Sequence, residues 1–313
     1  MNWSMYYRTC LLICIVIIFL MPVSAVALDE RYWYMSEVKN SVLVEAREIF
    51  LNGSAEACLA KLNAPELATR LAEDRGQSFQ RQYMRALSLY ELKRPKEALE
   101  ATNIALGLGW KLESPDYARL TILRSQLFLR LGDMMSMYTN ANQAVASTAI
   151  AFTAPHPASS TALILQAIGA SNLFQKPKSL DIAMQNLVLS NKNLKNLKTE
   201  DLEREPWASV VIMQKYIAGN VLSQRSDWKN AYYMFRHTAE VDARVKKVTP
   251  GDYVRNPFFL DSESGFDWTV NPEITGHCFS PILPAVCRGF RCPIQVFFDS
   301  SFRIESPFIE NVI

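Results

Sequence analysis

The sequence predicts an all-α protein built from stacked antiparallel helix pairs and followed by a short, cysteine-containing and partly β C-terminal tail. From about residue 32 to residue 247 glycine is scarce, and no stretch alternates apolar and polar residues for long enough to form a strand. After this region proline and glycine become more frequent and the aromatic residues cluster. Three regions are therefore expected: a targeting segment at 1–27, a helical domain at 28–247 and the tail at 248–313.

Short punctuation motifs mark where the helices begin and end. The motif Asn52-Gly53-Ser54 is suited to end one helix and start the next. Ser114-Pro115 has the pattern of an N-cap followed by proline in the first turn, and Pro206-Trp207 again places proline at a helix start. The prolines at 155 and 157 predict a turn. We therefore expect separate helices joined by short connections.

Several of these predicted helix pairs share one internal pattern. In residues 83–106 the first helix carries small Ala86 and bulky Leu89, and the second carries Ala98 and Ala105 after a short polar turn. Two antiparallel helices approach to about 8–10 Å only where their side chains are small. The same pattern recurs in residues 123–145, with Ser125 and Phe128 on the first helix, Gly132 in the turn and Ala144 on the second helix. It recurs again in residues 163–187 (Gly169, then Ala183) and 217–239 (Gly219 and Leu222, then Ala231 and Phe235).

This pattern resembles the tetratricopeptide repeat over residues 80–245. The resemblance implies a superhelix in which each helix pair covers the apolar face of the next. Ala98 and Ala231 lie 133 positions apart, which fits three intervals of about 44 residues rather than the 34 of that family. Gln82 and Thr121 stand where its first-helix aromatic residue falls. An irregular helical bundle is the alternative, because alanine and leucine at helical spacing also form an ordinary core.

The resemblance also implies a function, which is binding a protein or peptide in a long groove lined by the first helix of each pair. Polar residues on the predicted first helices are the candidates for that groove: Gln82, Arg85, Arg124 and Lys215. No cofactor and no metal are expected. The chain is thus predicted to be an interaction scaffold or adaptor in the cell envelope.

The first thirty residues have the composition of an export signal. Arg8 is the only charged residue before Asp29, and an uninterrupted apolar run follows it at 11–20. Ala25-Val26-Ala27 matches the pattern after which a signal peptidase cuts, so cleavage is expected after Ala27 and the product is periplasmic or secreted. The alternative is an uncleaved anchor at 11–28, since about 18 uncharged residues approach the length of a membrane span.

Four cysteines lie beyond the cleavage point, three of them close together near the C-terminus: Cys58, Cys278, Cys287 and Cys292. In an oxidising compartment this grouping predicts one or two disulfides, with three connectivities if all four cysteines pair. A zinc site with His277 beside the clustered cysteines is the alternative. The spacing lacks the Cys-x-x-Cys motif of structural zinc sites, so the disulfide interpretation is preferred.

Composition and motifs argue against two other classes of function. A net charge of +2 and a pI near 8.1 lack the basic excess of a nucleic-acid-binding protein. There is no Gly-x-Ser-x-Gly elbow, phosphate-binding glycine loop or His-Glu-x-x-His helix, so the chain is predicted not to be an enzyme. A secreted glycan hydrolase using the carboxylates between Glu200 and Glu205 is a minor alternative, because such clusters usually form the solvated start of a helix.

The tail adds one more alternative. Residues 295–298 and 301–305 are predicted as two short strands joined by a turn, and the tail as a whole is expected to cap the last helices. Three aromatic residues give the tail a surface suited to stacking on sugars: Phe258, Phe259 and Trp268. A glycan-binding or polysaccharide-assembly factor is therefore the second functional hypothesis.

Overall fold

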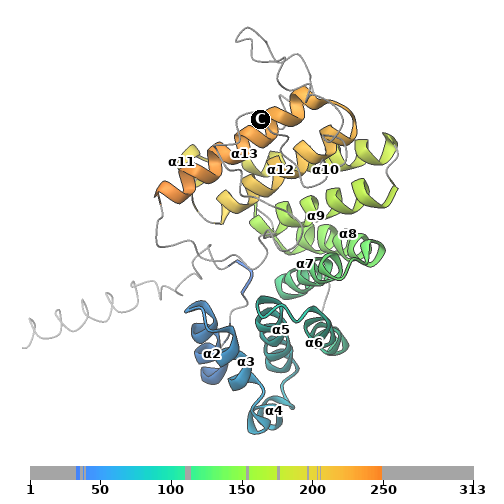
Figure 1. Ribbon diagram of the computed structural model, residues 1–313. Coiled ribbons are helices and arrows are strands. Elements are labelled where there is room, and N and C mark those ends of the chain that lie inside the picture. The colour runs from blue at the N-terminus through green and yellow to red at the C-terminus, as the bar shows by residue number, and fades with distance from the viewer. Residues whose placement is uncertain are drawn as a thin grey trace, which may run out of the picture.

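The computed structural model describes residues 33–248 apart from positions 36–37, 39, 110–113, 153–154, 175–176, 196, 203 and 205, and without the side chains of residues 174 and 242–248. Within this part of the chain all regular structure is helical, which confirms the all-α prediction there (Figure 1). The helices are α2 (Ser41–Leu51), α3 (Ala55–Leu62), α4 (Pro65–Leu71), α5 (Arg75–Glu91), α6 (Pro95–Gly107), α7 (Pro115–Arg130), α8 (Met134–Ala151), α9 (Pro157–Phe174), α10 (Pro177–Leu194), α11 (Thr199–Leu202), α12 (Trp207–Gln224) and α13 (Trp228–Val248).

The predicted helix starts lie where the sequence placed them. The Ser54 hydroxyl accepts a hydrogen bond from the backbone N–H of Ala57, and Ser114 caps α7 by accepting from the N–H of Asp116. Proline stands in the first turn of α7, and α12 begins at Trp207, directly after Pro206. At Ser54 and Ser114 the side-chain oxygen satisfies an N–H that has no partner within the helix.

Four turns inside the helix pairs share one backbone geometry. Each has a residue with positive φ: Gly53 at 87°, Lys93 at 58°, Gly132 at 75° and Ser226 at 62°. In every case the next residue donates its backbone N–H to a carbonyl five positions earlier: Ser54 to Ile49, Arg94 to Leu89, Asp133 to Phe128 and Asp227 to Leu222. This is the left-handed helix end that satisfies the last carbonyls of a helix, and here the same residue that closes it begins the next helix.

The helix pairs follow one another in chain order. The pairs are α2/α3, α5/α6, α7/α8, α9/α10 and α12/α13, and Figure 1 shows them ascending from the blue end to the orange end of the molecule. Each first helix from α5 onward contacts the first helix of the next pair, α5 with α7, α7 with α9 and α9 with α12. The short helices α4 and α11 are inserted between pairs. We call the side of the molecule formed by α5, α7, α9 and α12 the first-helix face.

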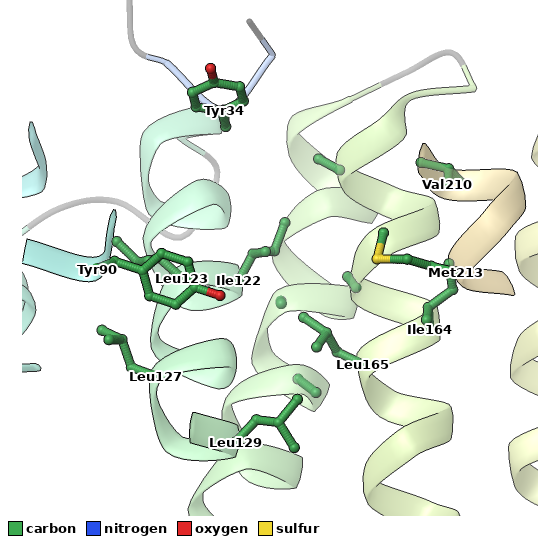
Figure 2. Close-up of a cluster of buried hydrophobic side chains, with 14 of the residues drawn as sticks. Tyr34, Tyr90, Ile122, Leu123, Leu127, Leu129, Ile164, Leu165, Val210 and Met213 are labelled. Atoms are coloured by element: carbon green, nitrogen blue, oxygen red, sulfur yellow. The ribbon is translucent and has the colours of Figure 1, made fainter. Parts of the chain in front are cut away.

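A single apolar core runs through these pairs. Figure 2 shows Ile122 and Leu123 on α7, and Ile164 on α9 beside Met213 on α12. The small residues of the repeated pattern lie where the helices approach most closely. A Cβ on Gly219 would come within 2.6 Å of the Phe235 ring on α13, and a Cβ on Gly169 would come within 2.6 Å of the Tyr138 ring on α8.

None of the helices in the described part of the chain has the length and apolarity needed to cross a bilayer. The predicted targeting segment at 1–27 and the tail from residue 249 onward lie outside the described residues. This part includes the predicted strands, Phe258, Phe259, Trp268 and the cysteines at 278, 287 and 292.

Candidate functional site

The first-helix face holds a short stretch of the chain's own N-terminal region. Trp33, Tyr34 and Met35 form this N-terminal segment, and their exposed fractions are 4%, 1% and 1%. Tyr83 on α5 donates from its hydroxyl to the Tyr34 carbonyl at 2.6 Å, and Arg119 on α7 donates from Nε to the Trp33 carbonyl at 2.6 Å. Two first helices therefore bind an irregular stretch of backbone through its carbonyl groups.

The aromatic and charged neighbours of Arg119 fix its position. Another guanidinium nitrogen of Arg119, Nη1, pairs with the Asp116 carboxylate at 3.0 Å, one turn earlier on α7. The guanidinium carbon lies 5.8 Å from the centre of the Phe152 ring, and Phe152 stacks on His156 at 3.8 Å between ring centres. The Trp33 indole meets the edge of His156 at 6.1 Å. The end of α8 and the start of α9 thus complete the site around the segment.

The His156 and Tyr83 rings of this site are neutral at physiological pH. Burial, and then the nearby positive charge of Arg119, lower the pKa of His156 to about 4. Burial is also the main reason that the pKa of Tyr83 lies well above its ordinary value of 10. The site is consequently suited to hydrogen bonding with peptide carbonyls and to contact with apolar side chains.

The predicted groove residues Gln82 and Arg85 form a separate cluster on α5. Arg85 donates from Nε to the side-chain carbonyl of Asn63 at 2.8 Å and from Nη1 to the side-chain carbonyl of Gln82 at 2.7 Å. Asn63 lies at the end of α3, the second helix of the preceding pair. Arg85 therefore points toward that second helix, whereas Tyr83 on the same helix points toward the N-terminal segment.

Arg124 links three helices. Its Nε donates to the side-chain carbonyl of Asn140 on α8 at 3.1 Å. Its Nη1 donates to two residues of α6, to the Thr102 hydroxyl at 3.0 Å and to the Asn103 side-chain carbonyl at 2.5 Å. The guanidinium also lies over the Phe128 ring at 5.6 Å. Burial lowers the pKa of Arg124 from its ordinary value. Like Arg85, it faces second helices, and its contacts bind one helix pair to the next.

Lys215, the fourth predicted groove residue, lies inside the molecule rather than on an open surface. Only 3% of the residue is exposed, and it lines a cavity of about 300 Å³ between α10, α11, α12 and α13. Burial lowers the pKa of its ammonium group to about 8. The four predicted residues are thus found in three different environments: a cluster at the end of α3, a bridge between pairs and a cavity.

Other sequence candidates have simpler positions. Cys58 on α3 is fully buried and forms no disulfide with another described residue, while its predicted disulfide partners lie outside the described residues. Burial raises the pKa of its thiol. Glu200 and Asp201 are exposed in the first turn of α11. Across the residues that the structure describes, no three histidine, cysteine or acidic side chains gather as a metal site requires.

Sequence reasoning did not single out Tyr83 or Arg119 as site residues. Their carbonyl partners lie 49 and 86 positions away, and no periodicity within a helix encodes a contact of that separation. The available signal was the group of large apolar residues Trp33, Tyr34 and Met35 ahead of the first helix, which needs a buried location.

No protein-family model matches this sequence, and neither a curated protein nor a solved structure matches it.

Proposed function

We propose that this chain is an exported helical-repeat scaffold that binds an extended stretch of polypeptide on its first-helix face. The observation that supports the proposal most directly is the N-terminal segment, which Tyr83 and Arg119 hold by two of its backbone carbonyls. Recognition through main-chain groups accepts many sequences, and neighbouring apolar pockets then select among them. In the free chain the N-terminal segment occupies this face. A partner polypeptide with backbone carbonyls and large apolar side chains in the same places displaces the segment.

The repeat architecture supports the same proposal. The four equivalent turns and the contacts between successive first helices are what a tetratricopeptide-like superhelix requires. In such an array the first helices lie side by side. Here α12 is buried from Trp207 to Leu222, so the contacts proposed for a polypeptide are those of α5 and α7. Export and cleavage after Ala27 are part of the proposal and rest on the sequence of residues 1–27.

A peptide supplied in trans tests the binding surface. In the full chain, Trp33→Ser removes the largest apolar group of the N-terminal segment and should expose the face. A synthetic peptide covering residues 30–38 is then expected to bind this variant, as measured by calorimetry, and to bind the wild-type chain far more weakly because the site is occupied. A scrambled peptide of the same composition is the control for non-specific apolar binding.

Two further substitutions locate the binding site. Arg119→Met, added to Trp33→Ser, should abolish binding because the donor to the peptide carbonyl is lost. Arg94→Met removes an exposed arginine that pairs with Glu97 on α6, so it should leave binding unchanged. Arg85→Ala, also added to Trp33→Ser, tests whether the predicted groove residue Arg85 contributes to peptide binding. Lack of peptide binding by a folded Trp33→Ser chain, or equal binding after Arg119→Met, would show that this face is not a polypeptide site.

A further inference from the structure

A second feature of the fold is independent of the first-helix face. The cavity of about 300 Å³ at the C-terminal end of the array is lined by residues of α10, α12 and α13 and by the α11 region between them. Its apolar wall includes Leu194, Val211 and Val241. A volume near 300 Å³ lies at the lower end of the range for pockets that take small organic molecules.

One of the two lysines that line the cavity, Lys215, is buried. The Lys215 ammonium is buried and has no hydrogen-bond partner among the described residues. A buried charge without a partner is unfavourable by several kcal/mol, so buried lysines are normally paired with a carboxylate or bonded to several oxygens. Lys215 is also the only lysine, arginine or acidic residue of α12, a helix that otherwise has apolar, amide and hydroxyl side chains.

None of the other charged and titratable groups among the described lining residues supplies a negative charge. Lys195 follows α10, and His237 comes from α13, while the other polar lining residues, Asn191 and Thr199, are uncharged. No carboxylate is among the lining residues that the structure describes. The cavity thus combines basic groups with an apolar wall, a combination that favours an anion carrying an apolar body.

We infer that this cavity is a binding site for a small monocarboxylic acid, with the carboxylate against the Lys215 ammonium and the hydrocarbon body against Leu194, Val211 and Val241. A carboxylate supplies the acceptors that the ammonium lacks, and a charge-assisted hydrogen bond of this kind is short and strong. A phosphate ester fits less well, since it requires donors on several sides and the wall here is largely apolar.

The test uses the full chain and straight-chain carboxylates from butyrate to decanoate, titrated by calorimetry near pH 7. Binding should be saturable with one site per chain, and affinity should rise with chain length until the cavity is filled. Octanoate is expected to bind at least about tenfold more tightly than 1-octanol, because the alcohol lacks the charge that pairs with Lys215.

Matched variants separate a specific site from general apolar binding. Lys215→Met keeps the length of the side chain and removes its charge, so octanoate affinity should fall at least about tenfold. Lys178→Met removes an exposed lysine near the start of α10 and should leave the affinity unchanged. Val211→Phe retains Lys215 but fills the cavity, and should abolish binding while circular dichroism shows the helical fold intact.

The pH dependence gives a second readout. Since the ammonium loses its proton near pH 8, octanoate affinity in the wild-type chain should fall as the pH rises above about 8. The same titration in Lys215→Met should be flat. Failure of every carboxylate to bind the folded wild-type chain, or equal octanoate affinity in wild type and Lys215→Met, would overturn the inference. Neither result bears on the polypeptide site, which uses Tyr83 and Arg119.

Discussion

Arg119 on α7 donates a hydrogen bond from Nε to the Trp33 carbonyl at 2.6 Å, joining parts of the chain that are 86 positions apart. This contact attaches the N-terminal segment to the middle of the helical array. The Arg119 guanidinium is largely buried and also pairs with Asp116, so both of its interactions form in a partly desolvated setting where they are stronger than at the surface.

We expect Arg119→Met to loosen the N-terminal segment. Loss of a charge-assisted hydrogen bond and of the Asp116 pair should lower the free energy of unfolding by about 2–3 kcal/mol, measured by urea denaturation. Hydrogen exchange at positions 33–35 should accelerate. Arg94→Met, which breaks the exposed Arg94–Glu97 pair, is the control and should leave the stability almost unchanged. Unchanged exchange at 33–35 would contradict the role given to Arg119.

Gly219→Ala should destabilise the last helix pair. The added Cβ would lie 2.6 Å from the Phe235 ring, so α12 and α13 must separate or the ring must move. Overpacking of this kind lowers stability by about 1–3 kcal/mol. Gly107→Ala is a matched control, because Gly107 ends α6 with no atom within 4 Å of the new Cβ, and should be neutral or slightly stabilising. Equal thermal midpoints for the two variants would refute this account of Gly219.

Ser226→Gly should stabilise the turn between α12 and α13. Ser226 has φ of 62°, a conformation that costs a residue with a Cβ roughly 1 kcal/mol or more, and Gly132 fills the equivalent position between α7 and α8. After allowance for the greater entropy of glycine in the unfolded chain, we expect a gain of about 0.5 kcal/mol. The reciprocal change Gly132→Ala should destabilise by a similar or larger amount, as judged from urea midpoints.

Arg124→Ala should weaken the contact between the second and third helix pairs. The substitution removes hydrogen bonds to Thr102, Asn103 and Asn140 and leaves the Thr102 and Asn140 side chains without that donor. A loss of about 1–3 kcal/mol in the free energy of unfolding is expected. If Arg124→Ala loses partner binding, its free energy of unfolding must be measured as well, because the loss can result from lower stability. Unchanged stability of Arg124→Ala would contradict the bridging role of Arg124.

Lys215 should make stability increase with pH. Its folded-state pKa of about 8 lies below the ordinary value of 10.5, so the unfolded chain binds more protons between these values and folding becomes more favourable as the pH rises. Between pH 8 and 10 the gain should be about 2 kcal/mol. The difference between wild type and Lys215→Met in parallel urea titrations isolates this group, and parallel curves would show that Lys215 titrates normally.

Local sequence was sufficient to predict much of the secondary structure. The caps at Ser54 and Ser114 and the turn at Gly132 depend on residues within one or two turns, and the structure confirms them. The small residues Gly169 and Gly219 were also identified, because helix periodicity shows which positions face another helix. The direction of polar side chains was not accessible in this way, as Arg85 and Tyr83 on one helix face different neighbours.

The sequence by itself predicted successive helices from about residue 32 to residue 247 with small residues at close approaches, since these features arise from propensity, capping and side-chain volume over short stretches. Only the tertiary structure decided that Trp33 and Tyr34 meet Tyr83 and Arg119, and that Lys215 is enclosed in a cavity. Those outcomes depend on how whole helix pairs stack. The stacking is the combined result of many contacts between residues far apart in the chain.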